Sequence, residues 1–543
     1  MRTIRRMNGL MMDFPLTLSA IFRRAEALFG RRDIVTRLPD TSIHRYKYAN
    51  FADRSRRLAR ALQRLGMNPG DRIATLGWNH YQHLEAYFGI PLMGGILHTL
   101  NLRLHPDELA YIINHADDGA VLVDESLLPL WDRIAPHTKV SNVIVVAADG
   151  RAPHGCVEYE SLVQNAEPMA DLPDPDERTA AAMCYTTGTT GRPKGVLYSH
   201  RALVMHTLGV SLGGCMSICE PDVVAPVVPM FHANAWGLPH AAVMMGAKIA
   251  MPGLHLDPAS LVDLFQRERV TVTAGVPTIW MAVLQLLDRQ PGAYDVSSIR
   301  AMLVGGAAAP QAMIEAYETR HGVKIVQGWG MTELTPVGTL SHLPCDMADE
   351  APEVQFRQRA KAGRPLPFVE IRARNEDGLI PWDDRTMGEL EVRGPWIASA
   401  YYNRDDCSDR FTADGWFRTG DIVTIDELAT VTIQDRSKDL IKSGGEWISS
   451  VALECALMGH PAVAEAAVIP VPHPKWSERP LAAVVLKPGA AATPADLREF
   501  LAPHFPKFWL PDAFEFIDAI PRTSAGKFQK AALRERYRDY RFE

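Results

Sequence analysis

The stretch Tyr185-Thr186-Thr187-Gly188-Thr189-Thr190-Gly191-Arg192-Pro193-Lys194-Gly195-Val196 follows an apolar run, Ala180–Cys184, that we expect to form a strand. Four threonines, three glycines and one lysine occur within these twelve residues. Glycine lets the backbone approach an oxyanion closely, and successive N–H groups with hydroxyls can surround a phosphate. The stretch therefore predicts a phosphate-binding loop, with an ordinary surface turn as the plain alternative. It differs from G-x-x-x-x-G-K-[ST], because Pro193 precedes the lysine.

Three further segments follow this loop in order: Gly328-Trp329-Gly330-Met331-Thr332-Glu333, Gly415-Trp416-Phe417-Arg418-Thr419-Gly420-Asp421 and Pro521-Arg522-Thr523-Ser524-Ala525-Gly526-Lys527. Together with the loop, they resemble the adenylate-forming superfamily of acyl-CoA synthetases, luciferases and peptide-synthetase adenylation domains. The resemblance covers nearly the whole chain. It is greatest to the bacterial medium- and long-chain fatty acyl-CoA synthetases.

The composition is typical of a soluble globular protein, with 47% apolar and 22% charged residues. A chain of 543 residues exceeds a single core, so we expect two or more domains. The net charge of −7 argues against a nucleic-acid partner. No apolar run reaches the roughly 20 residues of a membrane span, and Met1–Met12 lacks the apolar core of a signal peptide. Seven cysteines without a C-x-x-C pair indicate reduced thiols and no structural zinc.

Helix-like and strand-like patterns alternate through the first third of the chain, which predicts parallel sheets. Apolar residues recur at helical spacing in Leu18–Phe29 and Phe51–Leu65, and strands are expected at Arg72–Leu76, Ala120–Val123, Val143–Val146 and Ala301–Val304. A β-rich subdomain is expected around Lys361–Pro367, Glu370–Arg374 and Gly388–Arg393, and further short strands at Ala466–Pro470 and Ala482–Leu486.

The expected fold is therefore a multidomain α/β protein. A large N-terminal domain of stacked α/β sheets with a β-rich subdomain would span residues 1–435. A hinge would occupy residues 436–438, and a small mobile α+β lid would span residues 439–543. The mobility of the lid and its hinge are implied by the resemblance.

The resemblance also implies a set of roles at the nucleotide. Trp329 would stack on adenine, Asp421 and Arg436 would contact the ribose, and Thr332 would meet the α-phosphate. Thr186 and Glu333 would hold Mg²⁺, and a hydroxyl with a carboxylate suits a hard cation that bridges phosphates. The implied catalytic residues are Lys527, Glu333 and Thr186. The implied nucleotide-binding residues are Thr186, Thr187, Gly188, Thr189, Thr190, Lys194, Ala233, Gly306, Ala307, Gln327, Gly328, Trp329, Thr332, Asp421, Arg436, Lys438, Lys442 and Trp447.

Two further surfaces follow from the resemblance. The acyl pocket would be lined by His232, Trp236, Gly305, Gly306 and Gly330, and in the fatty-acid branch the residue that matches Trp236 is a gate on the acyl tunnel. Taken alone, a histidine near aromatic residues is more often a packed core residue. The glycine-rich turn Ser443, Gly444, Gly445 and Glu446 would form part of the CoA channel after the lid rotates about Lys438.

These roles imply an AMP-forming ligase that uses ATP, Mg²⁺ and CoA to convert a medium- or long-chain fatty acid into its thioester. The alternatives of the same class are ligases for a short thioether acid (methylmercaptopropionate) or an aryl acid, a carrier-loading adenylation enzyme and a luciferase-type monooxygenase. A non-catalytic acyl or nucleotide sensor is the alternative of another class. We further expect a cytoplasmic homodimer, with a peripheral visit to a membrane as an alternative.

Overall fold

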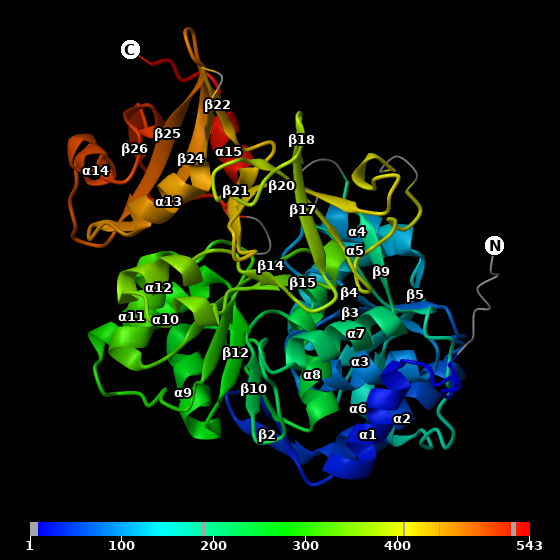
Figure 1. Cartoon of the computed structure of the whole chain (residues 1–543). Helices are drawn as coiled ribbons and strands as arrows, with labels where there is room; N and C mark the ends of the chain where they lie inside the picture. Colours follow the sequence, from blue (N-terminus) through cyan, green and yellow to red (C-terminus); the bar gives the residue numbers. More distant parts are fainter. Residues whose placement is uncertain (1–8, 187–191, 405–407, 445, 523–527, 543) are drawn as a thin grey trace, which may run out of the picture.

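The computed structural model describes residues 9–186, 192–404, 408–444, 446–522 and 528–542. Two large sheets and their covering helices form the N-terminal part, and a β-rich subdomain follows them. The segment from β22 (Ile441–Ser443) onward has a sheet of its own and stands above the N-terminal part in Figure 1. The expectation of a multidomain α/β protein with a small C-terminal α+β part is confirmed.

A seven-stranded sheet carries the threonine-rich stretch. Its strands lie in the order β7 (Val157–Glu158), β6 (Asn142–Val146), β5 (Asp118–Asp124), β3 (Arg72–Leu76), β4 (Ile96–Thr99), β8 (Ala180–Tyr185) and β9 (Gly195–Ser199). All neighbours are parallel except β8 and β9, which form an antiparallel pair. The expected parallel pairing is confirmed, and Thr186 follows β8 at the carboxyl edge of the sheet, where α/β folds place their ligands.

A nine-stranded sheet carries the two glycine-containing motifs of residues 301–333. Its order is β16 (Arg364–Pro365), β15 (Val337–Leu340), β14 (Ile325–Gly330), β13 (Ala301–Val304), β12 (Val272–Gly275), β10 (Val223–Pro226), β11 (Lys248–Met251), β1 (Asp33–Arg37) and β2 (Ile43–Lys47). Because β13 and β14 are parallel, their carboxyl ends lie at the same edge of this sheet, and Gly305 and Trp329 lie at these ends.

Two five-stranded sheets complete the fold. The β-rich subdomain has the order β18 (Gly378–Leu379), β17 (Glu370–Asn375), β19 (Gly388–Arg393), β20 (Phe417–Ile425) and β21 (Val431–Arg436). The C-terminal sheet has the order β23 (Glu446–Ile448), β22, β25 (Ser477–Leu486) and β24 (Val463–His473), with β26 (Ala513–Phe516) paired to β25. In the first of these sheets Asp421 lies opposite Arg436 across an antiparallel pair.

The helices cover these sheets (Figure 1). They are α1 (Leu18–Phe29), α2 (Tyr48–Arg64), α3 (Tyr81–Leu92), α4 (Pro106–Ala116), α5 (Leu128–Ile134), α6 (Tyr159–Gln164), α7 (His200–Ser211), α8 (Leu238–Met245), α9 (Pro258–Glu268), α10 (Pro277–Arg289), α11 (Gln311–His321), α12 (Pro352–Arg359), α13 (Ser450–Met458), α14 (Pro494–Leu501) and α15 (Lys530–Arg536). Helix α2 begins before its predicted start, where the Lys47 N–H donates to Asn50 Oδ1 at 3.2 Å and so caps the first turn. Within the described ranges, no helix is both long and apolar enough to cross a membrane.

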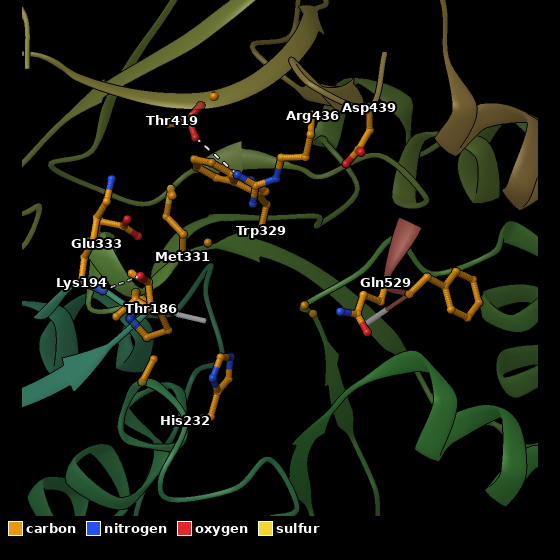
Figure 2. A pocket seen from close by; sticks show the side chains of 18 of the residues that line it. Thr186, Lys194, His232, Trp329, Met331, Glu333, Thr419, Arg436, Asp439 and Gln529 are labelled. Atoms are coloured by element: carbon orange, nitrogen blue, oxygen red, sulfur yellow. Dashed lines mark hydrogen bonds between the residues drawn. The ribbon is translucent and has the colours of Figure 1, made fainter. Parts of the chain in front are cut away.

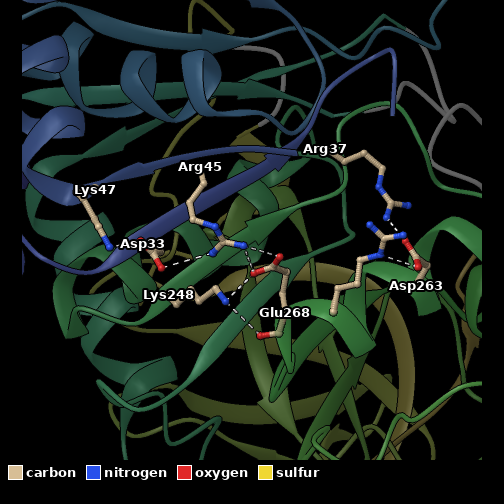
Figure 3. A network of polar contacts seen from close by, with 8 residues as sticks. Asp33, Arg37, Arg45, Lys47, Lys248, Asp263 and Glu268 are labelled. Atoms are coloured by element: carbon tan, nitrogen blue, oxygen red, sulfur yellow. Dashed lines mark hydrogen bonds and ion pairs between the residues drawn. The ribbon is translucent and has the colours of Figure 1, made fainter. Parts of the chain in front are cut away.

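The edge of the nine-stranded sheet is held by ion pairs. In Figure 3, Glu268 at the end of α9 accepts hydrogen bonds from Arg45 of β2 at 2.8 and 2.9 Å. Lys248 of β11 lies 2.6 Å from the same carboxylate, and Lys47 lies 2.6 Å from Asp33. Charged side chains on an edge strand also discourage pairing with a strand of another molecule.

Candidate active site

A cavity of about 540 Å³ lies where the two large sheets, the β-rich subdomain and the C-terminal part meet. Figure 2 shows Thr186, Lys194, His232, Trp329 and Glu333 around one side of it and Gln529 on the other. Most of the predicted residues that the structure describes lie at its wall: Thr186, Lys194, His232, Ala233, Trp236, Gly305, Gly306, Gly328, Trp329, Gly330, Thr332, Glu333, Arg436 and Lys438.

The base of the threonine-rich loop is closed by two hydrogen bonds. The Thr186 N–H donates to the Lys194 carbonyl at 2.9 Å, and the Lys194 N–H donates to Thr186 Oγ1 at 3.2 Å. These bonds continue the β8–β9 pairing and hold the Thr186 hydroxyl and the Lys194 side chain at the cavity. Thr187, Gly188, Thr189 and Thr190 lie outside the described residues, so their predicted contacts stay predictions.

Glu333 is a buried carboxylate at the wall of the cavity. It is 5% exposed, and its Oε1 accepts a hydrogen bond from the Tyr401 hydroxyl at 2.6 Å. The Lys194 ammonium lies 4.9 Å from the centre of the Tyr401 ring, which gives a cation–π contact. Tyr401 therefore links the end of the phosphate-loop stretch to Glu333, a role that the sequence pattern did not reveal.

A divalent cation fits this arrangement. In the described part of the chain no basic side chain forms an ion pair with Glu333, although a buried carboxylate is costly without a compensating charge. Thr186 supplies a neutral oxygen, and hydroxyl and carboxylate oxygens are the ligands that Mg²⁺ accepts together with water and phosphate. No group of three or more His, Cys, Asp or Glu side chains in the described ranges could form an all-protein metal site. Glu333 and Thr186 thus suit a cation that arrives with a phosphate ligand.

The predicted adenine and ribose residues form one hydrogen-bonded set. Trp329 Nε1 donates to Asp421 Oδ2 at 2.9 Å, and Arg436 Nε lies 2.8 Å from Asp421 Oδ1. Asp421 is 2% exposed and does not line the cavity itself, whereas Trp329 and Arg436 do. Each carboxylate oxygen can accept a second hydrogen bond. The arrangement therefore fixes the plane of the Trp329 indole and the direction of the Arg436 guanidinium.

Two predicted nucleotide contacts lie away from the cavity wall. Gln327 is buried, its Oε1 accepts from the Ala309 N–H at 2.7 Å, and its Nε2 donates to the Ala360 carbonyl at 3.0 Å. Its amide therefore holds the backbone that follows Gly306. In this structure the Gln327 side chain does not line the cavity, where a nucleotide contact would lie. Ala307 in that same loop is exposed and does not line the cavity.

Trp236 and Gly305, which are predicted to line the acyl pocket, pack against each other at the wall of the cavity. A Cβ added to Gly305 would lie 3.2 Å from the Trp236 ring and 3.1 Å from the Gly328 carbonyl, so the indole packs directly on the glycine. A Cβ on Gly330 would lie 2.0 Å from the Pro336 carbonyl oxygen. Small residues at these positions let the ring and the backbone close over the cavity.

The backbone before Trp236 is left-handed. Ala233, Asn234, Ala235 and Trp236 have φ values of 42, 52, 50 and 55°, and Gly237 follows at 78°. Left-handed backbone costs L-residues roughly 1–2 kcal/mol each, and it occurs mostly in single residues. Nothing in the composition of Pro229–Gly237 predicted this turn, which packs against the buried His206 through Gly237.

Two segments of the C-terminal part have predicted roles, the motif Pro521–Lys527 and the turn Ser443–Glu446. In this structure the residues beside the first segment line the cavity. Arg522, Phe528, Gln529, Lys530, Ala531 and Arg534 line the cavity, with Ser437, Lys438 and Asp439 from the connection. Burial lowers the pKa of Lys438. The face that carries the second segment does not line the cavity: Lys442 is exposed, Ser443 Oγ accepts from Arg479 at 3.1 Å, and Gly444 packs on Trp476.

The remaining predicted residues of that second face are Trp447, which is half-buried in β23, and Glu446, of which only the backbone is described. A single orientation of the C-terminal part can turn only one of its faces to the cavity, so Lys442 and Trp447 do not meet the nucleotide residues here. Gly445 and Lys527 lie outside the described residues.

The cavity wall is strongly basic. Among the described residues that line it, nine Lys and Arg residues face three acidic residues, Glu108, Glu333 and Asp439. Arg103, Arg192 and Arg410 belong to this basic set and were not predicted. Arg192 lies 5.0 Å from the Tyr111 ring, and burial lowers the pKa of Arg103. Such a wall suits a polyanionic ligand.

Comparisons with known proteins agree with this geometry. The family model described as AMP-binding enzyme matches residues 22–402, and the model described as AMP-binding enzyme C-terminal domain matches residues 452–527. A long-chain-fatty-acid–CoA ligase from Thermus thermophilus is 51% identical over 98% of this chain and 98% of its own.

A 3-methylmercaptopropionyl-CoA ligase from Ruegeria pomeroyi is 42% identical over 98% of this chain and 99% of its own. Among solved structures, ATP-bound MatB from Rhodopseudomonas palustris superposes with a TM-score of 0.81 at 27% identity, covering 96% of this chain and 99% of that one. The chain belongs to the AMP-binding enzyme family.

Proposed function

We propose that this protein is an AMP-forming fatty acid–CoA ligase. The observation that carries the proposal is one cavity in which a basic wall, the Thr186 and Glu333 oxygens and an apolar end closed by Trp236 meet. The similarity to the long-chain-fatty-acid–CoA ligase of Thermus thermophilus supports the substrate class. A ligase for a short thioether acid is the second candidate, because the Ruegeria relative bears that name.

The first half-reaction joins the acid to the nucleotide. A carboxylate oxygen attacks the α-phosphorus of ATP, and the bond from that phosphorus to the β-phosphate oxygen breaks, so acyl-AMP and pyrophosphate form. The protein positions the reactants and offsets the negative charge that spreads over the phosphoryl oxygens. Trp329 and Arg436 hold the nucleoside, while Lys194 faces the phosphates. Glu333 and Thr186 would hold Mg²⁺, which would supply positive charge to offset that of the phosphates.

The second half-reaction transfers the acyl group. The thiol of CoA attacks the acyl carbonyl, AMP leaves, and the thiol proton is lost to solvent. We assign Lys527 to the first half-reaction, between the substrate carboxylate and the α-phosphate. We divide the chain into an N-terminal domain of residues 1–435, a hinge of residues 436–438 and a lid of residues 439–543. Rotation of the lid would replace the face of Arg522–Arg534 by the Ser443–Glu446 turn.

The test of this function is CoA-dependent AMP formation with a panel of acids. The panel contains long- and medium-chain fatty acids, methylmercaptopropionate and an aryl acid. We expect AMP and pyrophosphate from ATP, with the highest kcat/KM for a medium- or long-chain fatty acid. Preference for methylmercaptopropionate would select the second candidate. Formation of ADP, or no turnover with any acid, would overturn the ligase assignment and favour a sensor.

Replacement of Trp236 by alanine is expected to change the preferred chain length by two or more carbons while the KM for ATP changes little. The indole closes the pocket against Gly305, so its removal opens space for the acyl chain. The measurement is kcat/KM over a series of fatty acids, with Trp382→Ala, at an exposed tryptophan between β18 and β19, as control. An unchanged preference would remove Trp236 from the pocket.

We also propose that the protein is a cytoplasmic homodimer. Leu10, Met11, Met12 and Phe14 of the N-terminal arm are 95, 87, 93 and 61% exposed, and contiguous exposed apolar residues mark an interaction site. A second copy of the chain is the partner that we propose for this arm. Contact with a membrane surface is the alternative.

The triple variant Leu10→Ser, Met11→Ser and Met12→Ser is expected to shift the dimer to monomer in sedimentation velocity. Its matched control is Leu379→Ser, which removes an exposed leucine from β18. A dimer that persists in the triple variant, or a monomeric wild type, would exclude the arm as the dimer contact. Binding of the wild type to lipid vesicles that the triple variant loses would instead support the membrane alternative.

A further inference from the structure

A buried charged cluster lies where β21 meets α13 and α15. Lys530, the first residue of α15, places its Nζ 2.7 Å from Glu454 Oε1 and 2.5 Å from Ser450 Oγ. The Ser450 N–H donates to Asp435 Oδ2 at 3.0 Å, and its hydroxyl donates to the same oxygen. Lys530, Ser450 and Asp435 therefore form a continuous chain of hydrogen bonds, with Glu454 paired to the ammonium.

This cluster joins the two sides of the proposed hinge. Asp435 belongs to β21 of the β-rich subdomain, before residues 436–438, whereas Ser450, Glu454 and Lys530 all follow them. The neighbouring Ser449 hydroxyl donates to the Gln434 carbonyl across the same boundary. Torsion in residues 436–438 would move α13 and α15 relative to β21, so rotation of the lid has to separate Asp435 from Ser450.

The charges of the cluster depend on Lys530. Burial raises the pKa of Asp435, and it raises the pKa of Glu454 to about 7, while the Lys530 ammonium acts against both shifts. A buried ion pair contributes little beyond its desolvation cost while it is intact, but removal of one partner is strongly unfavourable. Loss of Lys530 would therefore raise the pKa of both carboxylates further and favour their neutral forms.

The cluster also adjoins the cavity. Lys530, Ala531 and Arg534 line its wall, and Arg534 pairs with Asp439, the first residue of the lid. Lys530 stands three residues after Lys527, the lysine that we assign to adenylate formation. The link from Lys530 of α15 through Ser450 of α13 to Asp435 of β21 therefore keeps the face of the lid that carries Lys530 turned toward the nucleotide residues.

We propose that Asp435, Ser450, Glu454 and Lys530 form a latch that holds the lid in the orientation for adenylate formation, with Lys530 as its positioning residue. This inference rests on the proposed ligase function, and it names what sets the balance between the two orientations of the lid. When the hydrogen bonds of the latch are broken, the lid favours the orientation that turns the Ser443–Glu446 turn toward the cavity.

The test is Lys530→Met in the full chain, which keeps the length of the side chain and removes its charge. Acyl-adenylate formation, measured as fatty-acid-dependent pyrophosphate release, is expected to fall on the order of 10-fold, because the population of the latched orientation falls. Thioester formation from supplied acyl-adenylate and CoA is expected to stay unchanged or to rise. The control is Lys487→Met, at a half-buried lid lysine away from the latch whose ammonium donates to the Pro461 carbonyl at 2.7 Å.

The double variant Lys530→Met with Glu454→Gln separates a latch from mere structural support. The second substitution removes the Glu454 carboxylate that Lys530→Met leaves without a counter-charge, so the thermal midpoint is expected to return toward that of the wild type. Adenylate formation is still expected to be more impaired than thioester formation. Recovery of both, or an equal loss of both half-reactions in Lys530→Met, would overturn the latch. If Lys530→Met does not fold, Ser450→Ala replaces it. This variant removes the hydroxyl hydrogen bond to Asp435, keeps the one from the backbone N–H and keeps the ion pair, so the same imbalance is expected at a smaller size.

The two proposals fail in different ways. A wild type that forms no AMP with any acid of the panel contradicts the ligase function. A wild type with normal turnover, beside a Lys530→Met variant whose two half-reactions both match the wild type, contradicts the latch alone.

Discussion

Replacement of Lys527 by alanine is expected to lower acyl-adenylate formation by about 10²–10³-fold, equivalent to about 3–4 kcal/mol of transition-state stabilisation. The compact ammonium would lie between the substrate carboxylate and the α-phosphate, where it offsets charge that develops in the transition state. Arginine is expected to be a poor substitute, because its planar fork does not fit between two anions as a lysine does. The measurement is pyrophosphate release from ATP and a fatty acid in single-turnover conditions.

Thioester formation from supplied acyl-adenylate and CoA is the internal control for Lys527→Ala. It is expected to be spared, because in the proposed mechanism the lid would present its other face during acyl transfer. Equal loss of both half-reactions would contradict the role assigned to this lysine. The Lys530→Met variant is expected to lose adenylate formation more than thioester formation as well, but by a smaller factor. Comparison of the two variants therefore distinguishes a group that touches the substrate from one that orients the lid.

Replacement of Glu333 by glutamine is expected to lower adenylate formation by on the order of 10²–10³-fold and to raise the Mg²⁺ concentration needed for half-maximal rate. Glutamine keeps the volume of the side chain and can still accept the hydrogen bond of Tyr401, but it carries no charge to hold a cation. The measurement is the rate of pyrophosphate release as a function of free Mg²⁺.

The matched control for Glu333→Gln is Glu268→Gln, because both carboxylates are 5% exposed. Glu268 lies at the sheet edge and is paired with Arg45 and Lys248, so its substitution is expected to lower the thermal midpoint and to leave the Mg²⁺ dependence as it is. A Glu333→Gln variant with wild-type Mg²⁺ dependence would show that the cation binds elsewhere.

Much of the architecture was predictable because it rests on local patterns. Helix Leu18–Phe29 and strand Arg72–Leu76 have the bounds that their apolar spacing predicted, and Ala180–Tyr185 extends the predicted strand by one residue. Each of these elements buries one face or a short apolar run, so its pattern can be recognised from residues that are close together in the sequence. The start of α2 was missed because a hydrogen bond from the Lys47 N–H to the Asn50 side chain, and not the apolar period, marks the start of that helix.

The candidate site was predicted through motifs, which name residue types but not their partners. Thr186, Lys194, Trp329 and Glu333 do line one cavity. Gln327 belongs to the same motif, yet its amide is taken by the backbone of Ala309 and Ala360, which no local pattern shows. The left-handed turn before Trp236 is equally invisible, because alanine and asparagine are compatible with many backbone conformations.

The sequence by itself determined the fold class, the order of the motifs and the chemical types of group available for nucleotide chemistry, since apolar periodicity and short motifs are local properties. The tertiary structure alone decided that Tyr401 binds Glu333, that nine basic residues surround the cavity, and that Lys530 reaches Asp435 through Ser450. These partners lie 68, 80 and 15 residues apart in the chain. Packing of distant segments brings such groups together, and burial then strengthens their hydrogen bonds and electrostatic interactions.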